Sequence, residues 1–116
     1  MMNSVVITGR LAKDIEIKET KNGKKYSNLT LAINRPFKNA DGIYETDFVD
    51  VTVWGNIAES TKNRCEKGSV IGVKGRLETN IEEDKDGNTR KYLNVVCDSV
   101  SFIALKKEKN SRDEER

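Results

Sequence analysis

Apolar and polar residues alternate along most of this chain, which is the pattern of half-buried β-strands. In the segment 48–54, three valines at positions 49, 51 and 53 share one strand face. Phe48, Asp50, Thr52 and Trp54 share the other face. A strand that covers a core normally presents polar side chains to water on its second face. Here that second face carries two aromatic residues, so we expect it to bind a ligand.

The same alternation predicts further strands. They cover residues 4–11, 15–18, 26–33, 69–77 and 92–97, and a last apolar stretch over 100–105 completes a barrel or contacts another subunit. The side chains expected to face the core are Val5, Ile7, Leu11, Leu29, Leu31, Ile33, Ile71, Val73, Leu77, Leu93 and Val95. Gly9 lies inside the first strand and predicts a bend or a close backbone approach.

Turn residues separate these strands. Asn22-Gly23 is the strongest short hairpin signal, and both central residues of such a turn are expected to have positive φ. Asp86-Gly87 predicts a second hairpin in the same way. Pro36 and residues 39–42 end the strand 26–33 and predict a loop.

The spacing of the apolar residues changes after position 55. In residues 57–65 it predicts a short helix with the apolar side chains on one face. Asn56 is expected to be its N-cap, with Glu59 completing a capping box. Gly68 is expected to stop the helix after Lys67. About five mostly antiparallel strands, with one helix between the third and fourth, are typical of a partly open Greek-key barrel, although other small β domains share these counts.

The composition narrows the function. With 116 residues the chain has room for one domain, and 34% of its residues are charged. It has no histidine, which removes the commonest general acid/base and every Ser–His or Cys–His nucleophile pair. Two cysteines, Cys65 and Cys97, cannot build a four-ligand zinc site without carboxylates, and we predict reduced core thiols. We therefore expect a binding protein with no metal and no cofactor.

The ends of the chain carry no membrane signal. The N-terminus lacks a basic stretch followed by a long apolar one, and no apolar run approaches the roughly 18 residues of a membrane span. We predict a cytoplasmic protein with one domain over residues 1–105 and a charged, disordered tail over 106–116. The formal net charge of +2 does not by itself favour nucleic acid as the partner.

Five segments in order resemble the bacterial single-stranded DNA-binding protein family. They are Asn3–Asp14, Lys21–Gly23, Leu29–Arg35, Asp47–Glu59 and Lys67–Leu77, and the resemblance runs in register from Asn3 to Ile103. It implies an all-β chain with one short helix: an OB fold, the five-stranded Greek-key β-barrel. It also implies a homotetramer that binds single-stranded DNA without sequence preference in DNA replication, repair or recombination, with replication or recombination proteins as partners.

The resemblance also implies a binding site. Three positions, Phe37, Phe48 and Trp54, match aromatics that stack with bases in the family, and the alternation singles out the last two independently. Cations on outward faces or at strand ends are expected to contact phosphate: Arg10, Lys13, Arg35, Lys74, Arg76 and Arg90. Arg35 and Arg76 are expected to flank the aromatic surface. We expect the tyrosines to be sheet residues, with Tyr44 and Tyr92 half-buried and Tyr26 structural.

The sequence departs from the family pattern in two places. Glu82 stands where the family often has a hairpin aromatic, and a carboxylate there repels phosphate. We therefore predict weaker or shorter-site binding along that hairpin. The tail ends Asp-Glu-Glu-Arg instead of in the family's acidic tip finished by apolar residues, so recruitment through that tip is not expected. This pattern favours an accessory, plasmid or phage-borne form.

Two other classes of function stay open. An OB-fold protein–protein module of a primosome or recombination complex, with weak DNA affinity, is favoured by the modest charge and the acidic hairpin. The aromatic trio argues against it. A metal-dependent nuclease would need clustered carboxylates on strand faces, which the pattern lacks. The acidic cluster from Glu82 to Asp86 has no EF-hand spacing and is best explained as solvated.

Overall fold

The computed structural model describes residues 1–105, and the predicted tail over 106–116 lies outside that range. The elements follow one another as β1 (Val5–Leu11), β2 (Lys18–Glu19), β3 (Lys25–Lys38), β4 (Tyr44–Trp54), α1 (Gly55–Arg64), β5 (Val70–Glu83) and β6 (Thr89–Ala104). The strand order is β1-β5-β6-β4-β3-β2, and an additional β1–β3 pairing closes the sheet. Every pair is antiparallel except β4–β6, which is parallel. The five longer strands thus form a closed mixed barrel, and the predicted OB fold is confirmed.

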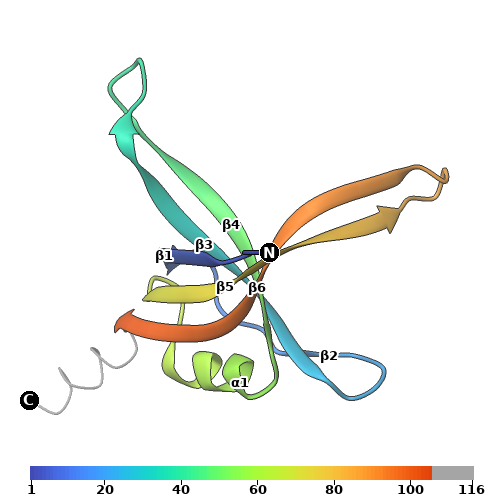
Figure 1. Ribbon diagram of the computed structural model, residues 1–116. Coiled ribbons are helices and arrows are strands. Elements are labelled where there is room, and N and C mark those ends of the chain that lie inside the picture. Colours follow the sequence, from blue (N-terminus) through green and yellow to red (C-terminus); the bar gives the residue numbers. More distant parts are fainter. Residues whose placement is uncertain (106–116) are drawn as a thin grey trace, which may run out of the picture.

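The barrel interior is filled by the alternating apolar residues, because successive side chains of a strand point to opposite faces. Leu11, Leu29, Leu31, Val51, Val53, Ile71 and Val73 are all essentially inaccessible to solvent. Gly9 confirms the expected close approach, since a Cβ atom there would lie 3.0 Å from side-chain atoms of Leu31 and Ile33. Helix α1 lies across one end of the barrel, with Ala58 and Thr61 buried (Figure 1).

Two long hairpins leave the barrel and diverge from each other, and we call them the β3–β4 arm and the β5–β6 arm (Figure 1). This geometry corrects two predicted core residues. Leu77 and Leu93 are 39% and 63% exposed. Leu93 lies on the β5–β6 arm, and Leu77 lies at the base of the arm, beyond the last β5 residue that pairs with β1, so neither is fully covered by a second layer. The stretch over 100–105 is not a separate strand, because β6 continues through it and pairs with β5, which completes the barrel as expected.

The three hairpin tips share one turn. In Thr20–Lys24, Asn39–Ile43 and Asp84–Asn88, the first residue's carbonyl accepts a hydrogen bond from the glycine N–H three residues on, at 2.9, 3.0 and 3.1 Å. Only the glycines have positive φ, so the expectation of a positive φ at Asn22 is wrong. A type I turn followed by one left-handed glycine makes a three-residue hairpin loop, in which the asparagine stays right-handed.

Several element ends differ from the predicted ones. Strand β3 does not stop at Pro36; it reaches Lys38 through an irregularity between Asn34 and Lys38, where a residue without an N–H is tolerated. Of the predicted strand 15–18, only the last residue enters β2, because Ile15 packs into the core instead.

The predicted helix caps are also wrong. Helix α1 begins at Gly55, directly after Trp54, and no side chain caps it. Glu59 instead accepts a hydrogen bond from Lys25 Nζ at 2.7 Å, which ties the helix to β3. The helix ends at Arg64, before Gly68, whose N–H donates to the Leu11 carbonyl.

Candidate nucleic-acid interface

The outward side of β4 carries the aromatics that the alternation singled out. Phe48 is 66% and Trp54 42% exposed, while Val51 and Val53 between them are buried and Val49 is partly buried against the core. Register places Phe48 opposite Ala32 and Trp54 opposite Tyr26, whose ring centroid lies 5.1 Å from that of Trp54. Six residues of strand separate Phe48 and Trp54 by roughly 20 Å. We call this surface, from Phe48 to the Tyr26–Trp54 pair, the aromatic face.

Polar side chains connect the strands between these aromatics. Thr52 Oγ1 donates to Asn28 Oδ1 at 3.1 Å and accepts from Asn94 Nδ2 at 2.7 Å, so the chain of bonds crosses β3, β4 and β6. Beside it, Thr30 Oγ1 donates to Asp50 Oδ1 at 3.2 Å. Of these hydrogen-bonded side chains only Asp50 is charged, and its charge is negative. The centre of the aromatic face therefore favours stacking over attraction of phosphate.

The aromatic face continues along the β3–β4 arm. Tyr44 alternates with Thr46 and Phe48 on β4 and so shares their face. Its ring is exposed, with Lys38 Nζ 5.7 Å from the ring centroid, so the prediction of a half-buried Tyr44 is wrong. The same two-residue alternation that indicated an outward Phe48 also indicates an outward Tyr44. Phe37 lies near the end of β3 and is 80% exposed, as expected of a residue with no core to join.

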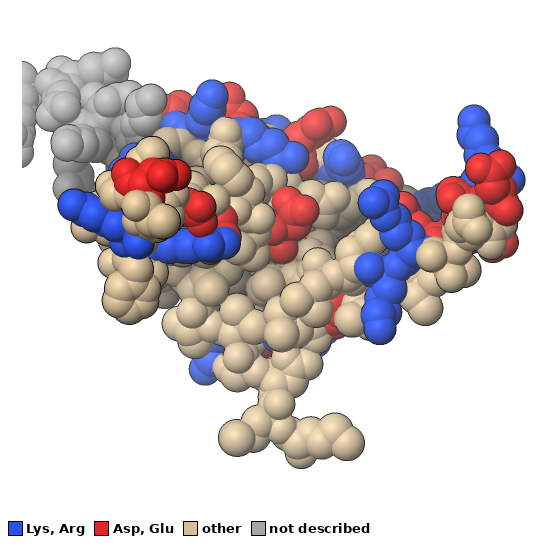
Figure 2. All heavy atoms as spheres, turned by 90° about the horizontal axis from the view of Figure 1, so that it is seen from above, with Lys and Arg blue, Asp and Glu red and all other residues tan. Residues whose placement is uncertain are grey.

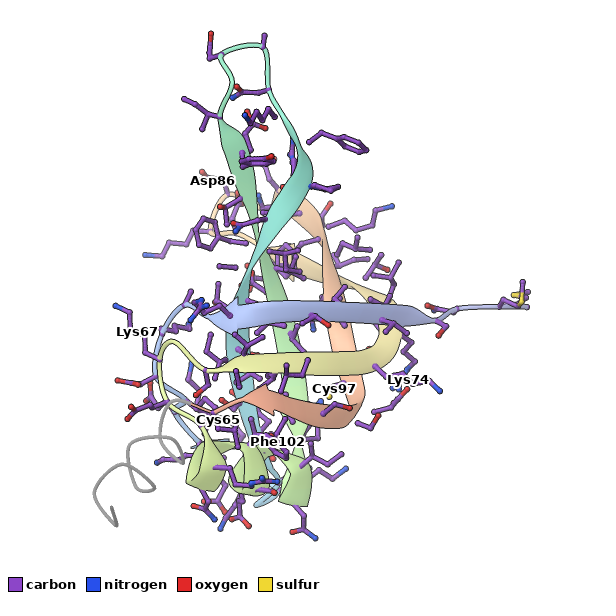
Figure 3. The ribbon with its side chains drawn as sticks, turned by 90° about the vertical axis from the view of Figure 1, so that its left-hand side faces the viewer. Cys65, Lys67, Lys74, Asp86, Cys97 and Phe102 are labelled. Atoms are coloured by element: carbon purple, nitrogen blue, oxygen red, sulfur yellow. The ribbon has the colours of Figure 1, made fainter. Side chains whose placement is uncertain are left out.

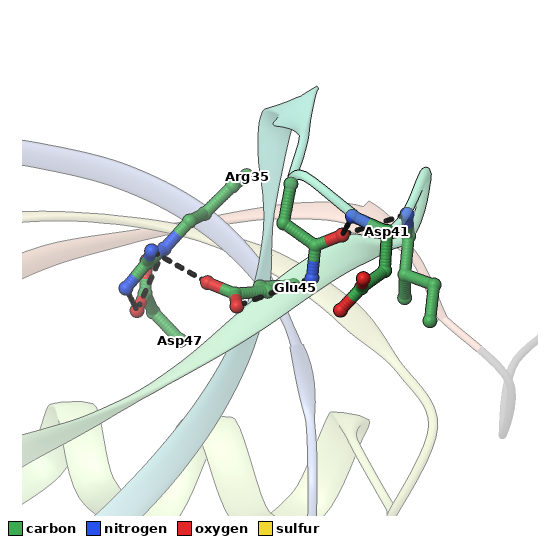
Figure 4. Close-up of polar contacts among 6 residues, drawn as sticks. Arg35, Asp41, Glu45 and Asp47 are labelled. Atoms are coloured by element: carbon green, nitrogen blue, oxygen red, sulfur yellow. Dashed lines mark hydrogen bonds and ion pairs between the residues drawn. The ribbon is translucent and has the colours of Figure 1, made fainter.

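Arg35 lies on the other side of the β3–β4 arm. Its Nε and Nη2 donate to Asp47 Oδ1 and Oδ2 at 2.9–3.3 Å, and its Nη1 donates to Glu45 at 2.7 Å (Figure 4). Glu45 and Asp47 lie on the face of β4 opposite to that of Phe48. The prediction that Arg35 flanks the aromatic face is therefore wrong. The guanidinium holds the pKa of the Asp47 carboxyl below its ordinary value, and the pKa of Arg35 rises in return.

Arg76 is held in the same way on β5. Its Nε and Nη2 contact Glu78 Oε2 at 3.1 and 2.9 Å, and its Nη1 contacts Asp98 Oδ1 at 2.9 Å. Glu78 stands opposite Asn94, which bonds to Thr52 on β4. Arg76 therefore lies on the same side of the sheet as the aromatic face, as predicted, but each of its three nitrogens already contacts a carboxylate.

The remaining predicted cations are dispersed. Lys74 on β5 points away from the sheet into solvent (Figure 3), and Lys13 is exposed after β1. Arg10 donates to the Gly68 carbonyl at 2.8 Å and so holds a loop. Arg90 stands opposite Glu82 on the β5–β6 arm. Lys and Arg are interspersed with Asp and Glu over the face seen in Figure 2, with no continuous basic patch.

The outer β5–β6 arm is acidic where the family pattern has an aromatic. The nearby Glu82 carboxylate raises the pKa of the Tyr92 hydroxyl above its ordinary value. Both side chains thus lie on one side of the arm, and the tyrosine neighbours a carboxylate rather than a second ring.

The described residues offer no support for a metal centre or a membrane span. Among residues 1–105, no group of three or more His, Cys, Asp or Glu side chains is arranged to hold a metal ion. Within the same range, no helix is long and apolar enough to cross a membrane.

Known proteins match this chain along nearly its whole length. The profile of the Single-strand binding protein family covers residues 2–103. A "Single-stranded DNA-binding protein 2" of Staphylococcus aureus (strain Mu50) is 47% identical over 91% of this chain and 75% of its own length. "Single-stranded DNA-binding protein B" of Bacillus subtilis (strain 168) is 40% identical over 97% of this chain and 100% of its own length. A "Single-stranded DNA-binding protein" of Oceanobacillus iheyensis is 41% identical over 97% of this chain and 70% of its own length. The barrel, the aromatic face and these matches agree: the chain belongs to the single-strand binding protein family.

Proposed function

We propose that this protein binds and protects single-stranded DNA without sequence preference during replication, repair or recombination. The observation that carries the proposal is the aromatic face, where a strand buries Val51 and Val53 and turns Phe48 and Trp54 to solvent. Every base has a π-face, so stacking is worth about 1–3 kcal/mol per base whatever the sequence. Binding of this kind needs neither a cofactor nor a proton shuttle, which fits a chain without histidine.

The proposed site combines stacking with a small number of phosphate contacts. Phe37, Phe48 and Trp54 take the bases. Lys13, Lys74 and Arg90 are exposed cations that contact phosphate, and Arg10, Arg35 and Arg76 contribute once their contacts within the protein open. Because so few cations are free, we expect a modest dependence of affinity on salt.

We further propose a homotetramer located in the cytoplasm on the nucleoid. Strand β1 supports assembly, since Val5–Arg10 pairs with β5 on one side and only Arg10 and Leu11 pair with β3 on the other. Among residues 1–105, this leaves part of one β1 edge unpaired, with Val6 exposed beside it. An open edge is a template for pairing with a second strand, and symmetric contacts of this kind are the usual route to homo-oligomers.

Fluorescence titration with oligo-dT tests the proposal. Trp54 is the single tryptophan of the chain, so quenching of its emission reports binding at the aromatic face directly. We expect quenching by dT and comparable affinity for mixed-sequence strands, decreasing as salt rises. An absence of quenching and of any mobility shift at low salt would refute DNA binding.

A triple variant separates DNA binding from a protein–protein role. Replacing Phe37, Phe48 and Trp54 by alanine should abolish binding of fluorescently labelled dT, measured by anisotropy, while light scattering shows an unchanged mass. If DNA binding survives all three substitutions, the aromatic face is not the site.

A further inference from the structure

The surroundings of Arg76 differ from those of a free phosphate-binding arginine. Glu78 and Asp98 take three of its nitrogens at 2.9–3.1 Å. One guanidinium against two carboxylates leaves this group of three residues, the Arg76 triad, with a net charge of −1 at neutral pH. A DNA strand that reaches this part of the sheet therefore meets a negative group, although the sequence offers an arginine there.

Carboxylate and phosphodiester compete for the same donors. Both are bound by the guanidinium fork through paired N–H groups. Glu78 occupies the Nε–Nη2 edge and Asp98 an N–H group of Nη1, so a phosphodiester that binds the Nε–Nη2 edge must displace Glu78. All three side chains of the triad are about half exposed, at 43–55%. Solvent-exposed ion pairs are weak and exchange readily. The carboxylates can therefore be displaced by phosphate, and displacement has a free-energy cost that weakens binding.

We infer that Glu78 and Asp98 act as internal competitors of the DNA phosphate at Arg76 and so lower both the affinity for single-stranded DNA and its salt dependence. This inference rests on the proposed function and goes beyond it, because it assigns a role to two acidic residues. In the free protein the carboxylates hold Arg76. When a strand lies on the aromatic face, its phosphate replaces at least one of them. Arg76 then contributes less than an unpaired arginine would.

Removing the competitors should strengthen binding. Exposed ion pairs are worth about 0.2–1 kcal/mol each, so the double variant Glu78→Gln/Asp98→Asn should bind oligo-dT about 2- to 30-fold more tightly. The slope of log K against log salt should steepen by about 0.7 for each additional phosphate that the variant neutralises. Each single variant should show part of both effects. Circular dichroism and light scattering establish that fold and mass are unchanged.

A double-mutant cycle distinguishes competition from simple charge removal. Arg76→Gln should weaken binding less than twofold in the native background but remove the increase in affinity in the Glu78→Gln/Asp98→Asn background. As a charge-matched control, Glu16→Gln/Asp41→Asn removes two exposed carboxylates, neither of which contacts an arginine within residues 1–105. The control should increase affinity less and leave the salt slope unchanged.

The outcomes separate the two proposals. If the native protein does not bind oligo-dT, the proposed function fails. If the native protein binds but the double variant binds no more tightly, only the competition at Arg76 is overturned. Competition at Arg76 is also overturned if the increase in affinity persists without Arg76 or equals that of the control.

Discussion

Gly75 lies where the β5–β6 arm joins the barrel, and alanine at this position should destabilise the protein severely. A Cβ atom there would lie 2.0 Å from the carbonyl oxygen of Val96 and 2.9 Å from its carbon. These are backbone atoms, so no side-chain rotation relieves the clash. The separation must grow by about 1 Å before it reaches the 3.0 Å below which Cβ contacts essentially do not occur.

The strand cannot move by that amount without losing pairing. Gly75 stands opposite Val5 of β1 and Cys97 of β6, beside the register shift between Lys74 and Gly75. Overpacking costs about 1–3 kcal/mol even where side chains adjust, so we expect about 2–3 kcal/mol for Gly75→Ala. At about 4–8 °C per kcal/mol for a domain of this size, the melting temperature should fall by roughly 10–20 °C.

Gly72 on the same strand provides the matched control. A Cβ there would meet its nearest atoms at 3.5–3.8 Å, which is ordinary contact. Gly72→Ala should be neutral or stabilising by up to about 1 kcal/mol, because alanine reduces the entropy of the unfolded chain. Urea unfolding followed by Trp54 fluorescence, at one protein concentration for all variants, measures both. A Gly75→Ala protein as stable as Gly72→Ala would refute the close packing at this junction.

Other parts of the molecule give four more predictions. Phe48→Ala should weaken oligo-dT binding by about 1–3 kcal/mol, whereas Phe102→Ala, remote from the aromatic face, should leave DNA affinity unchanged in anisotropy titrations. Glu82→Phe should tighten binding and lengthen the occupied site in a dT length series; unchanged affinity would mean that DNA does not reach the outer β5–β6 arm. Burial and the neighbouring Asp98 raise the pKa of the Cys97 thiol to about 11, so at pH 8 only about one molecule in a thousand is thiolate, and alkylation should be slow until urea unfolds the chain. The pKa of Asp47 is lower in the folded than in the unfolded protein, so its contribution to stability is complete above the unfolded pKa of about 4 and is lost as pH falls through the folded pKa. The urea midpoint of Asp47→Asn should therefore depend less on pH between pH 5 and 2 than that of the native protein. Parallel profiles of the two proteins would contradict the ion pair.

Local sequence determined those features that depend on the period of the chain. A two-residue alternation fixes which side chains share a strand face, so the buried valines and the outward Phe48 and Trp54 were predictable from residues 48–54 alone. The glycines at the hairpin tips were predictable for a different local reason, since only glycine readily takes positive φ. The barrel followed less from periodicity than from the resemblance of five segments to one family, because several small β domains share the same strand count.

Tertiary structure decided what depends on partners distant in sequence. Leu77 and Leu93 follow the alternation yet are exposed, because burial requires a covering layer, and that layer is incomplete at the base of the β5–β6 arm and along it. Arg35 and Arg76 look equivalent in sequence, each near an aromatic strand. Register puts Arg35 on the reverse side and joins Arg76 to the aromatic face, and only the fold brings Asp98 within 2.9 Å of Arg76. A charge pattern gives the number of cations, whereas strand pairing decides which of them phosphate can reach.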